Sequence, residues 1–198
     1  VARVCAQKGV FFHCDATQWV GKIDASELSC CTSFSASGHK FSGPKGVGWL
    51  ASTRPFPLQR GGEQENGWRG GTENYPSIAS MFSAFTESQE VLADFSGRAS
   101  WRDQFEINLL NFLPDTRILG KEHPRLWNTS MLVMPKFESL SWIGKLDKMG
   151  FSVSTGSACS TGSGTNPQVA SAMNLSVSET RRLIRISSYS NECAEDWP

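Results

Sequence analysis

The sequence predicts an α/β chain made of two parts, and three observations lead to this class. Val10 to Cys14 is a short, nearly continuous apolar run, as expected of a strand buried on both faces of a parallel sheet. Ser77 to about Leu113 carries apolar residues at helical spacing. Beyond this run, short strands alternate with helices, which favours a small second α/β or α+β unit. We place the boundary near residue 86, which divides the chain into 1–86 and 87–198.

The remaining elements follow from turn and breaker residues. In the first part, a Gly/Pro turn joins two expected strands in a tight antiparallel connection, and Pro76 suits the first turn of the long helical run. Gly97 is expected to break that run, and Pro114 to end it. The elements expected in this way are strands at 31–35, 47–51, 126–134, 151–154 and 183–187, and helices at 139–149, 166–173 and 177–182.

Composition excludes several classes of protein. The 198 residues are 39% hydrophobic, and 19 basic residues balance 19 acidic ones, so no charge excess favours nucleic acid or an anionic membrane. No apolar run is long enough to span a bilayer. The six cysteines show no CxxC spacing, which argues against a zinc site or a disulfide framework and favours the reducing cytoplasm.

The stretch from Ser33 to Gly48 leads through small hydroxylic residues to one lysine and then into a Gly/Pro turn. Such a segment suits a lysine Schiff base beside a phosphate cradle. Gly38 would let the backbone approach a ligand, Ser35 and Ser37 could donate to anionic oxygens, and Lys40 could form an imine with a carbonyl cofactor. Taken alone, the pattern fits a solvated loop lysine better.

Two further polar features have both a structural and a functional interpretation. Asp15 follows the first expected strand, so it is either a helix N-cap or a ligand-binding carboxylate at the carboxyl edge of the sheet. The glycine-dense segment 59–74 is either a mobile surface loop or a loop that contacts phosphate or a partner, with Thr72 as hydroxyl donor. It contains no Walker-type Gly-Lys-Ser/Thr, so an NTPase is not supported.

The segment 154–165 surrounds one thiol, Cys159, with small residues. A buried structural cysteine would have apolar neighbours, so this one is expected to be exposed on a flexible loop, where a thiolate can act as a nucleophile. An incidental cysteine in a linker is weighted equally. Arg185 ends an apolar run and is either a rim salt bridge or a side chain that grips a carboxylate with two hydrogen bonds.

Taken in order, these stretches resemble the class V aminotransferases, and most specifically the cysteine desulfurases. The resemblance covers nearly the whole chain, and several motifs in the family's order are far more specific than one. The matching elements are Phe-His-Cys-Asp-Ala-Thr-Gln (12–18), Ser-Gly-His-Lys with Gly-Pro-Lys-Gly (37–46), Arg-Gly-Gly-Thr (69–72), Ser-Thr-Gly-Ser-Ala-Cys-Ser (154–160) and Arg-Ile-Ser (185–187).

The resemblance implies a fold type I large domain and a cofactor, pyridoxal 5′-phosphate. Asp15 would pair with the pyridinium nitrogen of this cofactor and Gln18 would contact its ring oxygen. Ser37 and His39 would hold its phosphate, while Lys40 would carry the Schiff base and shuttle protons. His39 is counted with Lys40 as catalytic.

The resemblance also assigns roles to partners and substrate. Thr72 would reach the phosphate of the neighbouring subunit, which implies a homodimer. Arg185 would bind the α-carboxylate of L-cysteine. Cys159 would take the substrate's sulfur as a persulfide, release alanine and pass the sulfur to an acceptor protein of iron–sulfur or thiolation chemistry. The Ser-Ala-Cys-Ser form favours the long-loop desulfurases.

The chain also departs from the family pattern. Related proteins carry about as much chain again before the part that matches Val1, including a phosphate turn and a residue that stacks on the cofactor ring. We therefore expect a C-terminal-half fragment that is inactive alone: 1–86 would be the second half of the large domain and 87–198 the small domain with the cysteine loop. The alternatives are another class V enzyme (selenocysteine lyase, epimerase or transaminase) in which Cys159 is idle, or a cofactor-free interaction module.

Overall fold

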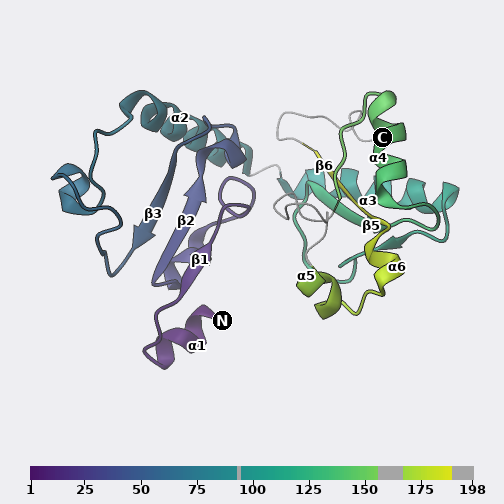
Figure 1. The fold of residues 1–198 in the computed structure, drawn as a ribbon, viewed down its shortest axis with the longest axis horizontal. Helices are drawn as coiled ribbons and strands as arrows, with labels where there is room; N and C mark the ends of the chain where they lie inside the picture. The colour runs from purple at the N-terminus through teal and green to yellow at the C-terminus, as the bar shows by residue number, and fades with distance from the viewer. Residues whose placement is uncertain (93–94, 156–166, 189–198) are drawn as a thin grey trace. The chain divides into compact units, whose positions relative to one another are not determined.

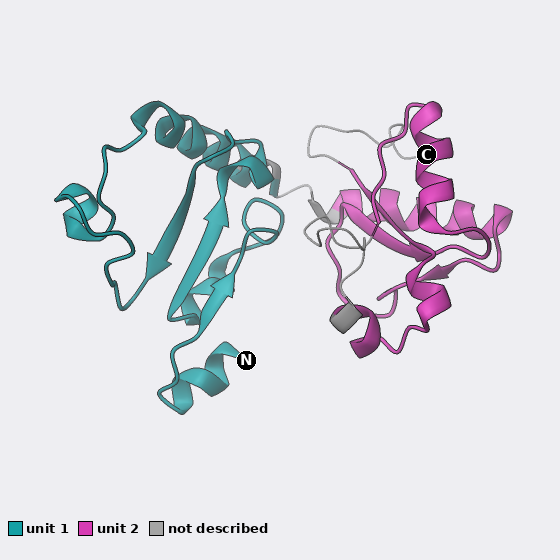
Figure 2. Cartoon of the chain, viewed as in Figure 1, with its two compact units in different colours: residues 1–95 teal, residues 96–198 magenta. Residues whose placement is uncertain are grey.

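The computed structural model describes residues 1–92, 95–155 and 167–188. The chain divides into two compact units, Val1–Phe95 (unit 1) and Ser96–Pro198 (unit 2), which Figure 2 shows in different colours. The assignment of domain roles to 1–86 and 87–198 stays a prediction. Within the described ranges, no helix has both the length and the apolar character that a membrane crossing needs.

Unit 1 contains a small sheet and one long helix (Figure 1). Short 3₁₀ helices at Ser26–Cys30, Gly38–Phe41 and Gln64–Gly67 lie in its connections. Its regular elements are α1 (Ala2–Gln7), β1 (His13–Asp15), β2 (Ser33–Ser37), β3 (Gly48–Ser52) and α2 (Tyr75–Leu92).

The strand order of this sheet is β1-β2-β3. β1 runs parallel to β2, with Asp15 opposite Ser35. β3 runs antiparallel to β2, with Gly48 opposite Ser37, which confirms the predicted antiparallel connection. That connection contains Ser42 and Gly46 in the left-handed region, at φ 69° and 80°, where glycine is favoured.

The prediction that Val10 to Cys14 forms a strand buried on both faces is wrong. The strand covers only His13–Asp15, with burial that alternates between exposed and half-buried. In the described part of the chain β1 lies at one edge of the sheet, and no strand beyond it covers the residues that precede it: Val10 is 53% and Phe11 44% exposed. The Phe11 ring instead packs edge-on against Phe56 at a centroid distance of 6.3 Å.

α2 covers one face of the sheet and closes the core of unit 1. Met81 and Ala84 of α2 pack in one cluster with Ala36 of β2 and Phe41 of the following 3₁₀ helix. The predicted helical run from Ser77 to about Leu113 is two helices in the structure, α2 and α3 (Phe95–Phe112). Gly97, expected at the break, lies inside the first turn of α3 instead.

Unit 2 contains a second sheet, in the order β4-β5-β6, with both strand pairs antiparallel. The expected strand at 151–154 reduces to one isolated bridge between Ser154 and Arg185. Together with α3, the regular elements are β4 (Arg117–Ile118), β5 (Thr129–Val133), α4 (Ser139–Lys148), α5 (Pro167–Ala172), α6 (Val177–Thr180) and β6 (Leu183–Ser187).

A charged cluster lies inside unit 2. Glu106 of α3 is 1% exposed. It accepts two hydrogen bonds from Arg125, at 2.7 and 3.0 Å, and one from the Ser130 hydroxyl at 2.7 Å. The hydrogen bond to Glu106 raises the pKa of Arg125 further above its ordinary value. Because every charge in this cluster has a close partner, it links α3 to β5 and to the segment before it.

Candidate functional site

Asp15 is the last residue of β1, and its carboxylate is held by the turn that follows. Oδ1 accepts a hydrogen bond from the Thr17 backbone amide at 3.0 Å. The side-chain and backbone hydrogen bonds of Thr17 hold the pKa of Asp15 below its ordinary value. Residues 17–22 form turns, so Asp15 caps a turn and no helix. The exposed carboxylate is therefore charged at neutral pH and accessible to a cationic ligand group.

The parallel pairing of β1 and β2 brings the predicted cofactor residues to one edge. Asp15 lies opposite Ser35, and the next residue on the same face of β2 is Ser37. The Ser37 hydroxyl hydrogen-bonds Nδ1 of His39 at 2.8 Å. Lys40 follows in the 3₁₀ helix Gly38–Phe41 and is half-buried. A carboxylate, a hydroxyl–imidazole pair and a primary amine thus gather at the carboxyl ends of two parallel strands, the usual location of ligands in open α/β sheets.

Gly38 is buried at the start of this turn, and the structure gives it a packing role. A Cβ at this position would lie 3.1 Å from the Met81 side chain and 3.2 Å from the Pro44 carbonyl oxygen. The backbone amide of Gly38 donates to the Val47 carbonyl at 3.0 Å. Glycine is therefore favoured here because the α2 side chain of Met81 and the return turn lie close to this backbone, whichever ligand is bound.

Gln18 and Thr72 also belong to unit 1. Gln18 lies in the turn that follows Asp15, and its Oε1 accepts a hydrogen bond from the Lys22 ammonium group. Thr72 follows a segment that is closed by its own hydrogen bonds: the amide of Leu58 donates to Trp68 at 2.7 Å, and that of Gly71 donates to Gln64 Oε1 at 3.0 Å. The hydroxyl donor therefore stands at the exit of a closed loop.

Arg185 lies on β6 of unit 2, where it meets the start of the predicted cysteine segment. Its amide donates to the Ser154 carbonyl at 2.7 Å, and the Ser154 amide donates back at 3.1 Å. The backbone that leads toward Cys159 thus starts beside the predicted carboxylate-binding residue. Cys159 itself lies outside the described residues.

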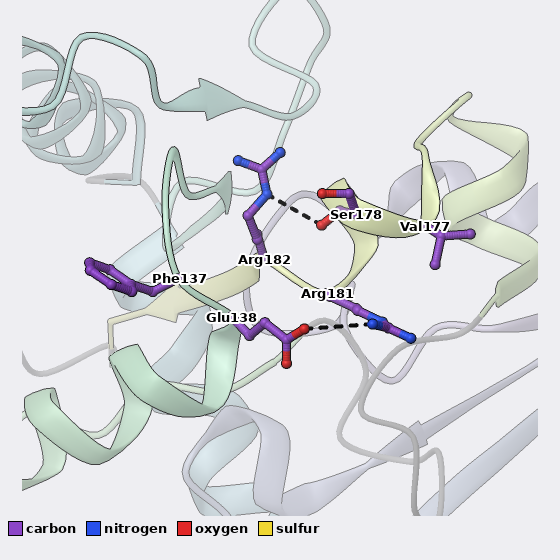
Figure 3. A pocket seen from close by; sticks show the side chains of 6 residues that line it. All are labelled: Phe137, Glu138, Val177, Ser178, Arg181 and Arg182. Carbon is purple, nitrogen blue, oxygen red and sulfur yellow. Dashed lines mark hydrogen bonds and ion pairs between the residues drawn. The ribbon is translucent and has the colours of Figure 1, made fainter.

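A hollow in the described part of unit 2 lies at α6, close in sequence to Arg185 but lined by other residues. It encloses about 440 Å³ and contains an ion pair between Arg181 and Glu138 at 3.7 Å (Figure 3). Arg182 is already engaged there, because its Nη1 donates to the carbonyls of Met134 and Pro135. No predicted site residue lines this hollow, so it does not enter the candidate site.

Two residues of the site were not identified from the sequence. Thr17 orients the Asp15 carboxylate, as described above. His13 faces the same side of β1 as Asp15, and its Nδ1 and Nε2 lie 2.8 and 3.3 Å from the hydroxyls of Ser33 and Ser35. The available signal was the spacing of two residues between His13 and Asp15, which places both side chains on one face of a strand.

This set of side chains fits pyridoxal phosphate. A carboxylate that stays charged can pair with a protonated ring nitrogen, and a serine–histidine pair can donate to a phosphate. A half-buried lysine amine on the adjacent turn can reach a carbonyl carbon. The edge provides the three kinds of group that such a cofactor requires.

The chain belongs to the class V aminotransferase family: the family described as aminotransferase class-V matches residues 1–197. This family depends on pyridoxal phosphate. The predicted family and fold class are confirmed.

Within the family, the chain is similar to proteins named cysteine desulfurase. The one from Enterobacter agglomerans is 36% identical over 100% of this chain and 51% of its own length. A NifS-like protein from Rickettsia africae has a structure with a TM-score of 0.84 and 25% identity, over 98% of this chain and 52% of that one. A structure described as SspA in complex with cysteine gives a TM-score of 0.69 and 28% identity, over 94% and 52%. The chain therefore spans about half the length of the relatives it matches.

Proposed function

We propose that the protein containing this chain is a pyridoxal phosphate-dependent cysteine desulfurase, which converts L-cysteine to L-alanine and transfers the sulfur to Cys159. The observation that carries the proposal is the β1–β2 register, because it puts the Asp15 carboxylate and the turn with Lys40 at one sheet edge. The similarity to cysteine desulfurases, and to a protein whose structure holds cysteine, supports the choice of substrate.

The residues of unit 1 would bind and orient the cofactor. The Asp15 carboxylate would keep a proton on the ring nitrogen, since its lowered pKa keeps it ionised over the working range of pH. Ser37 and His39 would donate to the phosphate, and the amide of Gln18 would donate to the ring oxygen. Bound pyridoxal phosphate supplies an electron-accepting ring that stabilises negative charge on the substrate. Lys40 would hold the cofactor and move protons with its Nζ.

The residues of unit 2 would handle the substrate. Arg185 would grip the α-carboxylate of L-cysteine with two parallel hydrogen bonds. The Cys159 thiolate would form a sulfur–sulfur bond with the substrate thiol while the substrate carbon–sulfur bond breaks. That carbon gains a proton, so one thiol and L-cysteine give L-alanine and a persulfide on Cys159, with atoms and electrons balanced.

Three further parts of the proposal concern the setting of this reaction. A homodimer would let Thr72 of one subunit donate to the cofactor phosphate of the other. A sulfur-acceptor protein would remove the persulfide sulfur. The cytoplasm is the proposed compartment, supported by the free thiols of Cys5, Cys14, Cys30 and Cys31. Domain roles would follow the division into 1–86 for the cofactor and 87–198 for the cysteine loop.

The test begins with binding. The protein is mixed with pyridoxal phosphate, reduced with borohydride and digested, and mass spectrometry locates the pyridoxyl group. We expect it on Lys40 and, in a Lys40→Ala variant, nowhere at high yield. Absence of the label from Lys40 in the full-length protein that contains this chain would contradict both enzyme hypotheses and leave the interaction module.

A turnover assay then distinguishes the two enzyme hypotheses. L-Cysteine and a reductant are added, and sulfide and alanine are measured. We expect Cys159→Ser to abolish both products, whereas Cys30→Ser, the same change at an exposed thiol, leaves them unaltered. Normal alanine release from Cys159→Ser would contradict the desulfurase and favour another class V reaction.

A further inference from the structure

His13 has no part in the mechanism proposed above, although it shares one strand face with Asp15. Its Nδ1 lies 2.8 Å from the Ser33 hydroxyl and its Nε2 lies 3.3 Å from the Ser35 hydroxyl. Ser33 is 1% exposed, and a buried hydroxyl needs a hydrogen-bond partner. One imidazole ring therefore spans two hydroxyls that stand two residues apart on the neighbouring strand.

This link is placed where the pairing of β1 is weakest. β1 has three residues, and in the described part of the chain it pairs only with β2. A slip of one residue would turn the Asp15 side chain to the opposite face of the sheet. The His13 ring opposes a slip of one residue, because that register would carry its two nitrogens to the other face of the sheet, away from both serine hydroxyls.

The position of β1 along β2 determines the geometry of the candidate cofactor site. Asp15 ends β1, whereas β2 leads directly into Ser37 and the turn with Lys40. The offset of the two strands therefore sets the distance between Asp15, which would bind the ring nitrogen, and Ser37 and His39, which would bind the phosphate. A rigid ligand such as the cofactor ring fits only one such distance.

We propose that His13 is a positioning residue, which fixes this offset and so matches the site to pyridoxal phosphate. The inference rests on the proposed function, because it concerns the same site. Electrostatics supports it as well: after the hydrogen bonds from Thr17, the nearby imidazole also helps to lower the pKa of Asp15.

The test compares two substitutions in the full chain. His13→Phe keeps a ring but removes both nitrogens, whereas His13→Asn keeps a polar group near the Nδ1 position. His123→Phe is the matched control, since His123 is exposed in unit 2. Pyridoxal phosphate affinity is measured by absorbance titration. We expect His13→Phe to weaken it by about tenfold, the effect of losing two ordinary hydrogen bonds. His13→Asn should recover part of the loss, and His123→Phe should change nothing.

A double-mutant cycle separates positioning from general stabilisation. If His13 acts through Asp15, then His13→Phe should have little further effect on cofactor affinity in an Asp15→Asn background. An equal loss in both backgrounds, or a lower unfolding midpoint with unchanged affinity, would overturn the inference.

A second measurement tests the role of His13 without the cofactor, in case the chain binds none. Nitrogen-15 spectra of the imidazoles in the free protein should show His13 as one fixed tautomer with both nitrogens hydrogen-bonded. Averaged tautomers would overturn the inference. If the protein forms no sulfide or alanine, but His13 shows the expected spectra and the expected effect on cofactor affinity, the proposed function is contradicted and this inference stands.

Discussion

The polar cluster of unit 1 and that of unit 2 use similar groups in opposite ways. In unit 2, the Glu106 carboxylate is sealed from water, and each of its oxygens accepts from Arg125. In unit 1, the Asp15 carboxylate is exposed, and its described partner is the turn that starts at Thr17. Removal of one partner from a satisfied buried ion pair destabilises the fold, whereas an oriented, accessible charge is available to a ligand. The comparison predicts that substitution of Asp15 and its neighbours affects chemistry, whereas substitution of Glu106 affects folding.

The largest effect is expected at Lys40. Lys40→Ala should lower alanine formation by about 10²- to 10⁴-fold, the usual contribution of a positioned proton-transfer group. Lys40→Arg should fail as well, because a guanidinium does not form the covalent link of an amine. Initial rates and the urea midpoint are measured together, with Lys45→Ala in the exposed turn as control. A Lys40→Ala variant of normal activity would break the comparison.

The next effect is on stability and belongs to unit 2. Glu106→Gln removes the close counter-charge of the half-buried Arg125 and leaves it only the more distant Asp103, at 3.9 Å, so we expect a loss of about 3 kcal/mol in the free energy of unfolding. Urea unfolding followed by tryptophan fluorescence measures it. The exposed Glu122 provides the control substitution, which should leave the midpoint unchanged. A double variant, Glu106→Leu with Arg125→Leu, should recover much of the loss. If Glu106→Gln were as stable as the parent, the buried cluster would not hold unit 2 together.

Asp15→Asn should sharpen the contrast, because it affects turnover more than stability. We expect alanine formation to fall by about a hundredfold or more, as when an oriented charge is removed from a reaction site. The stability effect should be small and depend on pH. Since folding lowers the pKa of Asp15, its contribution is present above its ordinary value of 3.8 and is lost as pH falls through the lower folded value. Unfolding curves from neutral pH down to acid measure the difference between parent and variant, which should vanish at the acid end.

The smallest effects come from two glycines with opposite surroundings. Gly38→Ala would press a methyl group against Met81 and backbone oxygens, so we expect a loss of about 1–3 kcal/mol in the free energy of unfolding. Gly144→Ala, in exposed space on α4, should gain about 0.5–1 kcal/mol through helix propensity. Thermal and urea unfolding measure both changes. Equal shifts of one sign would show that close packing at Gly38 is not the cause.

Much of the fold followed from local patterns. β6 matches its predicted bounds, and α4 ends just before Gly150, which has the positive φ of 89° that a helix end favours. The two-residue strand β4 and the helix α1 were not predicted. A strand of that length carries no alternation of its own, because its pairing is decided by β5. α2 and α3 were predicted as one run, because helical periodicity continues from one to the other.

The sequence allowed prediction of the site residues that lie at or next to the ends of predicted strands. Asp15, Ser37, His39 and Lys40 stand at the ends of adjacent strands, so a strand prediction already places them together. The contact between His13 and Ser35 depends on the register of β1 against β2, which cannot be predicted from a local sequence pattern. Ser35 was expected to donate to anionic oxygens, and the structure places its hydroxyl against that histidine instead.

The pairing of β1 with β2 also limits where this chain can change in length. The connection between the strands, residues 16–32, passes through exposed positions such as Asp24, where one added residue leaves Asp15 opposite Ser35. One residue added at Cys14 would instead turn the Asp15 side chain to the other face of the sheet. Insertions should therefore be tolerated in the connection and excluded from the three-residue strand. The number of residues in β1, more than their identity, keeps the Asp15 side chain on the face of the candidate site.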